Sequence, residues 1–286
     1  MFRPNRVFVL VAALIGIVAP KANGDSILTI GNSLTWDSLP PYLSGDVDWH
    51  IYCGKSLSFI NENPEGHCVT SSTPWPVALA SKDYDFVTVQ PYLGSTFDED
   101  LEIISNWMRK QPNATFVVHT GWNTHETHFE AYVDETETTE TRISRDYFDR
   151  LMDALHEAFP DRKLVRTQSA EVLYEIALDI ENGNAPIDKL SDLYRDTHHM
   201  STSGGGHYLM HNLLRKALGQ PAKLGTTILP SDTQLSPELT TYLNSKFLSV
   251  SAVPEPNMFV GFIAAAGAGC GFFRRRFAAK TSTASR

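Results

Sequence analysis

The chain has 286 residues, of which 42% are hydrophobic and 20% are charged. These proportions fit one globular domain of ordinary size with additional terminal segments. The formal net charge is −9, and the only clustered basic run is at 274–276. Phosphate binding depends on clustered positive charge, so this balance argues against nucleic acid as a partner of the folded part.

The N-terminal segment 1–24 predicts a secretory signal peptide. Two arginines precede a short apolar stretch at 7–19, and small residues at 22–24 offer a cleavage site. The apolar stretch is too short for a comfortable membrane span. We therefore expect an exported chain that begins near Asp25, and the alternative is a retained N-terminal anchor.

Apolar runs and helical patterns alternate through the middle of the chain. We expect strands over residues 27–30, 47–53, 86–90, 115–119 and 163–167. We expect helices over residues 39–43, 98–110, 147–159, 170–180 and 205–218. This alternation predicts a parallel sheet covered by helices on both faces. The acidic stretch 124–141 has no apolar period and predicts an exposed loop, whereas 237–250 has a weak helical period.

A serine follows the first expected strand directly. The strand runs into Gly31-Asn32-Ser33, which places Ser33 at the carboxyl edge of the sheet, where open α/β folds bind ligands. The N-terminal amides of a helix beginning near Leu34 would point toward a substrate and stabilise an oxyanion. A free hydroxyl is a weak nucleophile, so this serine needs a base.

A second motif supplies that base shortly before the last helix of the domain. Asp196 and His199 are three residues apart, which lets the carboxylate reach Nδ1 of the ring while Nε2 faces the nucleophile. His198 is the competing base. We favour His199 because Ser201 and Gly204 fall where the helix should begin.

With both motifs in place, the chain resembles the SGNH/GDSL hydrolase family. The matching segments are 31–35 and 196–201, in the order and separation of that family. The resemblance implies a flavodoxin-like α/β fold, a three-layer α/β/α sandwich around a mostly parallel five-stranded sheet. It assigns Ser33 as nucleophile, with Asp196 and His199 completing the catalytic triad.

The resemblance also implies an oxyanion hole made by the backbone N–H of Ser33 and two further donors. Gly54 occupies the position of the family's glycine after the second strand, although a plain turn glycine is the alternative reading. The family's asparagine after the third strand is missing, because the chain there reads Gln90-Pro91. Since a glutamine amide can also donate to an oxyanion, we predict that Gln90 takes this role.

Other side chains near the expected sheet edge carry weaker signals. Trp122 and Asn123 follow the fourth strand and are candidates for the substrate pocket, with core packing as the alternative for the tryptophan. His207 and His211 have a spacing that can bind zinc, but the sequence offers no evident third ligand. We therefore expect neither a metal nor another cofactor.

Three cysteines are present, and Cys53 and Cys68 lie in the part expected to be exported, with Cys270 in the tail. Exported proteins keep disulfides, so we predict a Cys53–Cys68 bridge. Closing a loop of about 15 residues contributes about 3 kcal/mol in the chain-entropy model. The alternative is a pair of reduced, buried thiols.

The C-terminal segment 253–286 predicts a sorting tail. Pro-Glu-Pro at 254–256 is followed by an apolar stretch at 258–273 and then by the arginines. This order fits a membrane insertion with its basic end on the cytoplasmic side. The tail resembles the PEP-CTERM sorting signal of bacterial surface proteins. This resemblance implies export, either to the cell surface or outer envelope or as a secreted protein, with transient membrane anchoring and an exosortase-type processing enzyme. An ordinary C-terminal anchor is the alternative.

These features define four segments: the signal peptide, a catalytic domain at 25–222, a linker with a C-terminal helix at 223–252, and the tail. The leading functional hypothesis is an exported serine esterase that hydrolyses a small-molecule or carbohydrate ester, such as an O-acetyl group. A non-catalytic glycan-binding or structural surface module on the same fold is the second hypothesis. A metal-dependent hydrolase using His198, His199 and His207 is the third.

Overall fold

The computed structural model describes residues 24–136, 138–225 and 234–250. The expected signal peptide and the expected sorting tail at 253–286 fall outside these ranges, Gly24 excepted. Within the described ranges, no helix combines the length and the apolar character that crossing a membrane requires.

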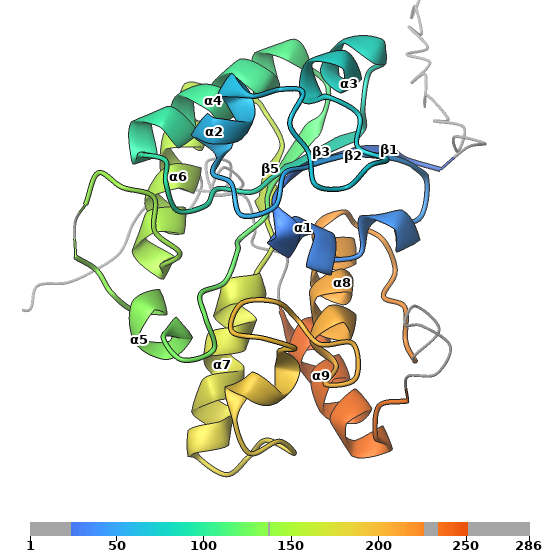
Figure 1. Cartoon of the computed structure of the whole chain (residues 1–286), viewed down its shortest axis with the longest axis vertical. Helices are drawn as coiled ribbons and strands as arrows, with labels where there is room; N and C mark the ends of the chain where they lie inside the picture. Colours follow the sequence, from blue (N-terminus) through green and yellow to red (C-terminus); the bar gives the residue numbers. More distant parts are fainter. Residues whose placement is uncertain (1–23, 137, 226–233, 251–286) are drawn as a thin grey trace, which may run out of the picture. The chain divides into compact units, whose positions relative to one another are not determined.

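A parallel sheet lies at the centre of the fold (Figure 1). It has five strands in the order β2-β1-β3-β4-β5. Its strands are β1 (Ser26–Gly31), β2 (Asp46–Ile51), β3 (Phe86–Val89), β4 (Thr115–Val118) and β5 (Leu164–Arg166). All neighbouring strands pair in parallel. The expected α/β class is confirmed, and each expected strand matches an observed one to within one or two residues at its ends.

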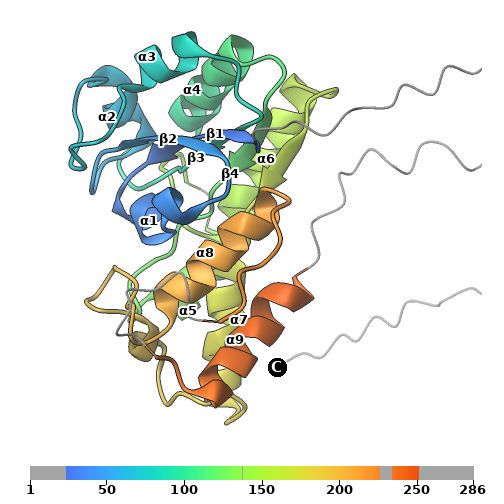
Figure 2. The same cartoon turned by 90° about the vertical axis from the view of Figure 1, so that its right-hand side faces the viewer.

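Helices bury both faces of the sheet, as parallel pairing requires. One face, with Leu28, Val87 and Phe116, packs against a layer of four helices. These are α2 (Leu57–Glu62), α3 (Trp75–Ser81), α4 (Phe97–Lys110) and α6 (Arg145–Ala158). The other face, with Ile27 and Val117, packs against α8 (Gly206–Ala217). Figure 2 shows α8 and the short helix α1 (Ser33–Asp37) on the side of the sheet opposite α2, α3 and α4.

A second apolar cluster joins α8 to α7 (Ser169–Glu181), α9 (Pro237–Ser249) and the 3₁₀ turn η2 (Leu190–Leu193). The ring centroids of Tyr208 and Phe247 lie 5.8 Å apart in an edge-to-face contact between α8 and α9. Lys246 on α9 forms a 2.6 Å ion pair with Asp179 on α7. The helix expected near 237–250 therefore docks on the domain.

Two local expectations need correction. The stretch expected as an exposed loop contains α5 (His128–Tyr132), in which both terminal residues are buried. His128 lies against Tyr132 in a stacked contact, and its Nε2 is 2.9 Å from the carbonyl oxygen of Ala170. A single helical turn is too short to show an apolar period. The expected helix near residue 40 is a 3₁₀ turn, η1 (Pro40–Tyr42), because consecutive prolines remove its backbone donors.

The order of the strands reverses beside the carboxyl end of β1. The chain passes from β1 to β2 on one side and returns to β3 on the other. Open α/β sheets bind ligands outside the carboxyl ends of their strands at such a switch point. Ser33 lies two residues beyond the end of β1 and Gln90 directly follows β3, so the topology brings both residues to this edge.

Candidate active site

The turn after β1 presents Ser33 as the first residue of α1. Asn32 caps this helix, and its side-chain oxygen accepts a 2.9 Å hydrogen bond from the backbone N–H of Leu34. Gly31 must be a glycine, because a Cβ there would lie 2.1 Å from Oγ1 of Thr35 and 2.9 Å from Cβ of Gln90. This close packing fixes the point at which the chain leaves β1 and enters the turn that carries Ser33.

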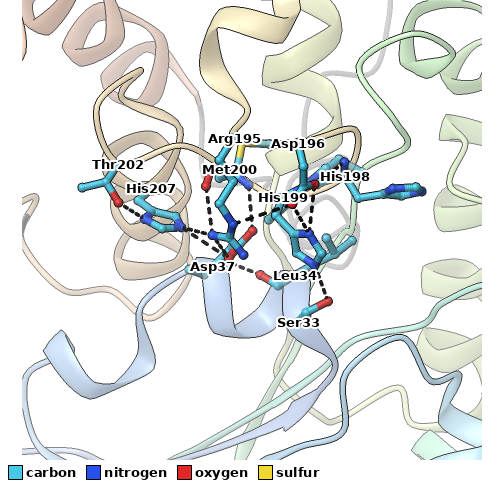
Figure 3. Close-up of polar contacts among 12 residues, drawn as sticks. Ser33, Leu34, Asp37, Arg195, Asp196, His198, His199, Met200, Thr202 and His207 are labelled. Atoms are coloured by element: carbon cyan, nitrogen blue, oxygen red, sulfur yellow. Dashed lines mark hydrogen bonds and ion pairs between the residues drawn. The ribbon is translucent and has the colours of Figure 1, made fainter. Parts of the chain in front are cut away.

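The loop before α8 brings the second motif to the serine. His199 Nε2 lies 3.0 Å from Ser33 Oγ, and His199 Nδ1 lies 2.9 Å from the nearer oxygen of Asp196 (Figure 3). The same carboxylate accepts hydrogen bonds from the backbone N–H groups of His198 and His199, at 2.9 and 2.8 Å. The structure thus places Ser33, His199 and Asp196 in one continuous chain of contacts.

The environment of Asp196 decides which ring nitrogen carries the proton. Burial alone would raise the pKa of this carboxyl, but the two backbone N–H groups and the His199 ring outweigh it and hold the pKa at about 2. An ionised carboxylate only accepts hydrogen bonds, so Nδ1 of His199 is the donor. Nε2 is then left with its lone pair directed at the hydroxyl of Ser33.

Three groups outside the 195–200 loop hold the loop in place. The indole Nε1 of Trp122 donates a 2.8 Å hydrogen bond to the carbonyl oxygen of His198. The backbone N–H of His125 donates to the carbonyl oxygen of Thr197 at 3.2 Å. Oδ2 of Asp37 accepts from the backbone N–H of Met200 at 2.7 Å. The base therefore sits on a segment tied both to α1 and to the loop after β4.

Trp122 does not line an open pocket, which corrects one of our expectations. Its side chain is 1% exposed and belongs to the apolar cluster around α8. Its only polar atom is committed to the His198 carbonyl. Asn123 is partly exposed, and its side-chain amide donates to the carbonyl oxygen of Ile143 at 2.8 Å. A substrate-contacting role for Asn123 stays a prediction.

Gln90 is buried beside the nucleophile turn, and its carbonyl oxygen is already engaged. This oxygen accepts a 2.9 Å hydrogen bond from the backbone N–H of Thr35 and a weaker one, at 3.4 Å, from that of Asn32. The amide nitrogen is buried and has no hydrogen-bond acceptor among the described residues. It lies near Gly121, where it would approach an added Cβ to 3.1 Å. Donation from Gln90 to an oxyanion stays a prediction.

Gly54 lies in the exposed turn that follows β2. Its φ of +67° favours glycine, and a Cβ there would meet no atom within 4 Å. The side-chain amide of Asn32 donates to the carbonyl oxygen of Lys55 at 3.3 Å, so this turn is tied to the nucleophile turn. The contribution of Gly54 to an oxyanion hole likewise stays a prediction.

A disulfide joins Cys53 and Cys68, whose Cα atoms are 5.7 Å apart. The backbone N–H of Cys68 also donates to the carbonyl oxygen of Ile51 at 2.9 Å. The disulfide therefore closes the loop that begins at the Gly54 turn. The hydrogen bond from Cys68 holds the end of this loop against the end of β2.

The two histidines spaced for zinc serve different partners. His211 is buried, and its Nδ1 lies 3.0 Å from the carbonyl oxygen of Ser38. Burial lowers the pKa of His211 to about 4. His207 faces Asp37 and Thr202 instead. Across 24–136, 138–225 and 234–250, no three His, Cys, Asp or Glu side chains are grouped so that they could hold a metal ion.

Asp37 and Arg195 were not predicted as site residues from the sequence. Both lie within the site, and Arg195 Nη1 is 3.1 Å from Oδ1 of Asp37. One signal was available, because Asp37 is one helical turn beyond Ser33 and thus on the same face of any helix that starts there. Nothing in the sequence connected it to Arg195, which is more than half the domain away along the chain.

No protein-family model and no curated protein sequence matches the chain. Among solved structures, it is similar to a member of the lipolytic G-D-S-L family from Veillonella parvula, at 11% identity and a TM-score of 0.41, over 68% of this chain and 99% of that one. It is also similar to a putative GDSL-like lipase from Parabacteroides merdae, at 14% identity and a TM-score of 0.43, over 68% of this chain and 95% of that one. A third is salicylyl-acyltransferase SsfX3 from a tetracycline biosynthetic pathway, at 9% identity and a TM-score of 0.41, over 70% of this chain and 55% of that one. These likenesses concern the α/β fold alone.

Proposed function

We propose that this chain is a serine esterase that cleaves an acyl ester through Ser33, His199 and Asp196. One observation carries the proposal: the hydroxyl of Ser33 lies 3.0 Å from an imidazole whose other nitrogen lies 2.9 Å from a carboxylate. Nucleophile, base and orienting group are the parts that acyl transfer to a serine requires.

In the proposed reaction, Ser33 Oγ attacks the ester carbonyl as its proton passes to His199 Nε2. Asp196, ionised and hydrogen-bonded to Nδ1, stabilises the imidazolium that forms. His199 then donates the proton to the leaving alkoxide, which departs and leaves an acyl group on Ser33. A water molecule, deprotonated by His199, then attacks the acyl carbonyl and breaks its bond to Ser33 Oγ. His199 returns the proton to Ser33 Oγ, and the carboxylic acid leaves.

The charge that develops on the carbonyl oxygen needs hydrogen-bond donors. We propose the backbone N–H groups of Ser33 and Gly54 for this purpose, together with the amide of Gln90. The nitrogen of Gln90 is buried and meets no acceptor in the part of the chain that the structure describes, which supports its inclusion. The oxygen of the same amide holds Thr35, which limits how far the amide can turn. Removing one donor from such a site typically costs about a hundredfold or more in rate.

We further propose that the esterase is exported and acts on a carbohydrate or small-molecule ester, with O-acetyl groups as the first class to test. The disulfide supports an oxidising compartment, since such bonds persist mainly outside the cytosol. Export, membrane anchoring through the tail and processing by an exosortase-type enzyme are proposals drawn from the terminal segments of the sequence.

Hydrolysis of p-nitrophenyl acetate by the full chain tests the proposal. Ser33→Ala should lower turnover by about a thousandfold or more, because the nucleophile is lost. Ser245→Ala, an exposed serine on α9, is the matched control and should retain wild-type turnover. Wild-type turnover in Ser33→Ala, with both variants folded by circular dichroism, would overturn the assignment.

The same assay separates the two other hypotheses. A non-catalytic surface module predicts no turnover above the buffer rate in the wild type. A metal-dependent hydrolase predicts that chelation with EDTA abolishes turnover, whereas the proposed chemistry predicts the same rate before and after chelation.

A further inference from the structure

A buried carboxylate lies between the two halves of the site and takes no part in the proposed proton transfers. Asp37 is the last residue of α1 and is 2% exposed. Its Oδ2 accepts a 2.7 Å hydrogen bond from the backbone N–H of Met200, the residue after His199. Its Oδ1 lies 3.1 Å from Arg195 Nη1 and 3.3 Å from His207 Nε2 (Figure 3).

The short helix α1 therefore holds the base at two points. Ser33 and Asp37 are one turn apart and share a face of the helix. At one end, the hydroxyl of Ser33 meets the ring of His199. At the other end, the carboxylate of Asp37 accepts a hydrogen bond from the backbone N–H of the residue that follows His199. A rotation of α1 or a slide of the loop would disturb both contacts together.

Arg195 extends this connection to the third member of the triad. Its side chain is 46% exposed, and its Nε lies 3.8 Å from Oδ2 of Asp196. Its Nη1 also donates to the carbonyl oxygen of Met200 at 3.2 Å. One cation thus stands between the carboxylates of Asp37 and Asp196. A carboxyl group buried in this way needs polar partners, and Asp37 finds them in Arg195, His207 and the backbone N–H of Met200. The position of the loop is therefore tied to the side chain of Asp37.

We propose that Asp37 is a positioning residue for the chemistry at Ser33, with Arg195 as its bridge to Asp196. This inference rests on the proposed esterase function. Asp37 touches none of the reacting atoms in the structure and acts by keeping His199 within reach of Ser33. Misplacing a reacting group by about 1 Å can cost about a hundredfold in rate, so a support of this kind controls the rate without contacting substrate.

The test compares the full-length wild type with Asp37→Asn in three measurements. These are the second-order rate of fluorophosphonate modification at Ser33, kcat and KM for p-nitrophenyl acetate, and hydrogen exchange of the Met200 amide. We expect Asp37→Asn to slow modification about tenfold or more and to lower kcat similarly, with KM within about twofold of the wild type. Exchange of the Met200 amide should accelerate, because its acceptor loses its charge.

Arg195→Gln is the second variant, because a half-exposed side chain can be replaced without unfolding the domain. Like Asp37→Asn, it should slow the modification of Ser33, lower kcat and accelerate exchange of the Met200 amide. Each of these rates should change by about threefold or more. Arg150→Gln is its matched control: Arg150 is 35% exposed and pairs with Asp146 at 2.8 Å on α6. This control should match the wild type in every measurement.

The outcomes separate this inference from the function on which it rests. If the wild type neither reacts at Ser33 nor turns over substrate, the proposed function fails and the inference with it. If the wild type reacts and folded Asp37→Asn reacts at the same rate, with unchanged Met200 exchange, only the positioning role is overturned. If Asp37→Asn does not fold, Arg195→Gln decides, and wild-type behaviour in that variant overturns the inference.

Discussion

The side-chain oxygen of Gln90 accepts a 2.9 Å hydrogen bond from the backbone N–H of Thr35, two residues beyond the candidate nucleophile. Gln90 follows β3 and Thr35 lies within α1, so this bond joins two neighbouring strand ends. A side chain that the sequence suggested as an oxyanion donor thus anchors the nucleophile turn through its other amide atom.

Replacing Gln90 with Met should therefore reduce both stability and reactivity. The variant leaves the buried N–H of Thr35 without its acceptor, which costs about 1–3 kcal/mol of unfolding free energy. We expect urea denaturation to show this loss and fluorophosphonate modification of Ser33 to slow about tenfold, since the serine turn is loosened.

Gln111→Met is the matched control for this prediction. Gln111 is also buried, accepts a 2.9 Å hydrogen bond from the N–H of Tyr84 and donates to the carbonyl oxygen of Leu79 at 2.8 Å. It should lose similar stability while its folded fraction reacts at the wild-type rate. Equal reactivity of the two variants would contradict the anchoring role of Gln90.

Trp122→Phe removes one hydrogen bond to the loop that carries the base and keeps most of the buried ring. The carbonyl oxygen of His198 loses its 2.8 Å donor, so His199 should hold its orientation less well. We expect kcat/KM for p-nitrophenyl acetate to fall about three- to tenfold, with a stability loss of about 1 kcal/mol.

Trp75→Phe provides the comparison, because Trp75 Nε1 donates to the carbonyl oxygen of Ile60 at 3.1 Å on the other face of the sheet. Its kcat/KM should equal that of the wild type. A larger loss of activity in Trp75→Phe than in Trp122→Phe would argue against the support that we assign to Trp122.

Much of this arrangement was predictable from the sequence, and the reason lies in local pattern. The strand before Gly31 and the Asp-x-x-His spacing of Asp196 and His199 are local signals. Chain order then brings them to one sheet edge, because parallel strands share their carboxyl ends. The roles of Trp122 and Gln90 were not predictable in this way. Both depend on which polar atom of a buried side chain meets which distant backbone group, and residue type alone does not encode that choice.

Asp100 should make stability depend on pH in a specific direction. It is buried on α4, accepts hydrogen bonds from Thr141 at 2.7 Å and Tyr147 at 2.5 Å, and burial raises its pKa to about 6 despite them. Because its pKa is raised, the folded state binds the proton of Asp100 more tightly than the unfolded state does. The stability that comes from this proton is fully present below the unfolded pKa near 3.8 and is lost as the pH rises through 6. The full difference corresponds to about 3 kcal/mol.

Asp100→Asn isolates this effect, because the amide stays neutral at every pH. The unfolding free energy of the variant minus that of the wild type should rise by about 3 kcal/mol between pH 3.5 and pH 8. Urea denaturation at the two pH values measures the difference. A difference that stays constant, or that falls with rising pH, would refute the assignment.

The disulfide should stabilise the domain by closing the loop beside β2. Replacing Cys53 and Cys68 together with Ser removes a bridge with a sequence separation of 15, which costs about 3 kcal/mol in the chain-entropy model. We expect a lower melting temperature in scanning calorimetry. Treating the wild type with a reductant should reproduce most of the shift, and an unchanged melting temperature in the double variant would contradict this contribution.

The most direct test of the central claim is the site of fluorophosphonate modification in the full-length wild-type chain, identified by mass spectrometry. The contact between Ser33 Oγ and His199 Nε2 predicts one adduct, on Ser33. It also predicts that His199→Ala, which removes the base, slows that adduct by about a hundredfold or more. An unmodified Ser33, or an adduct that forms equally fast in His199→Ala, would contradict the account of this protein as a serine esterase.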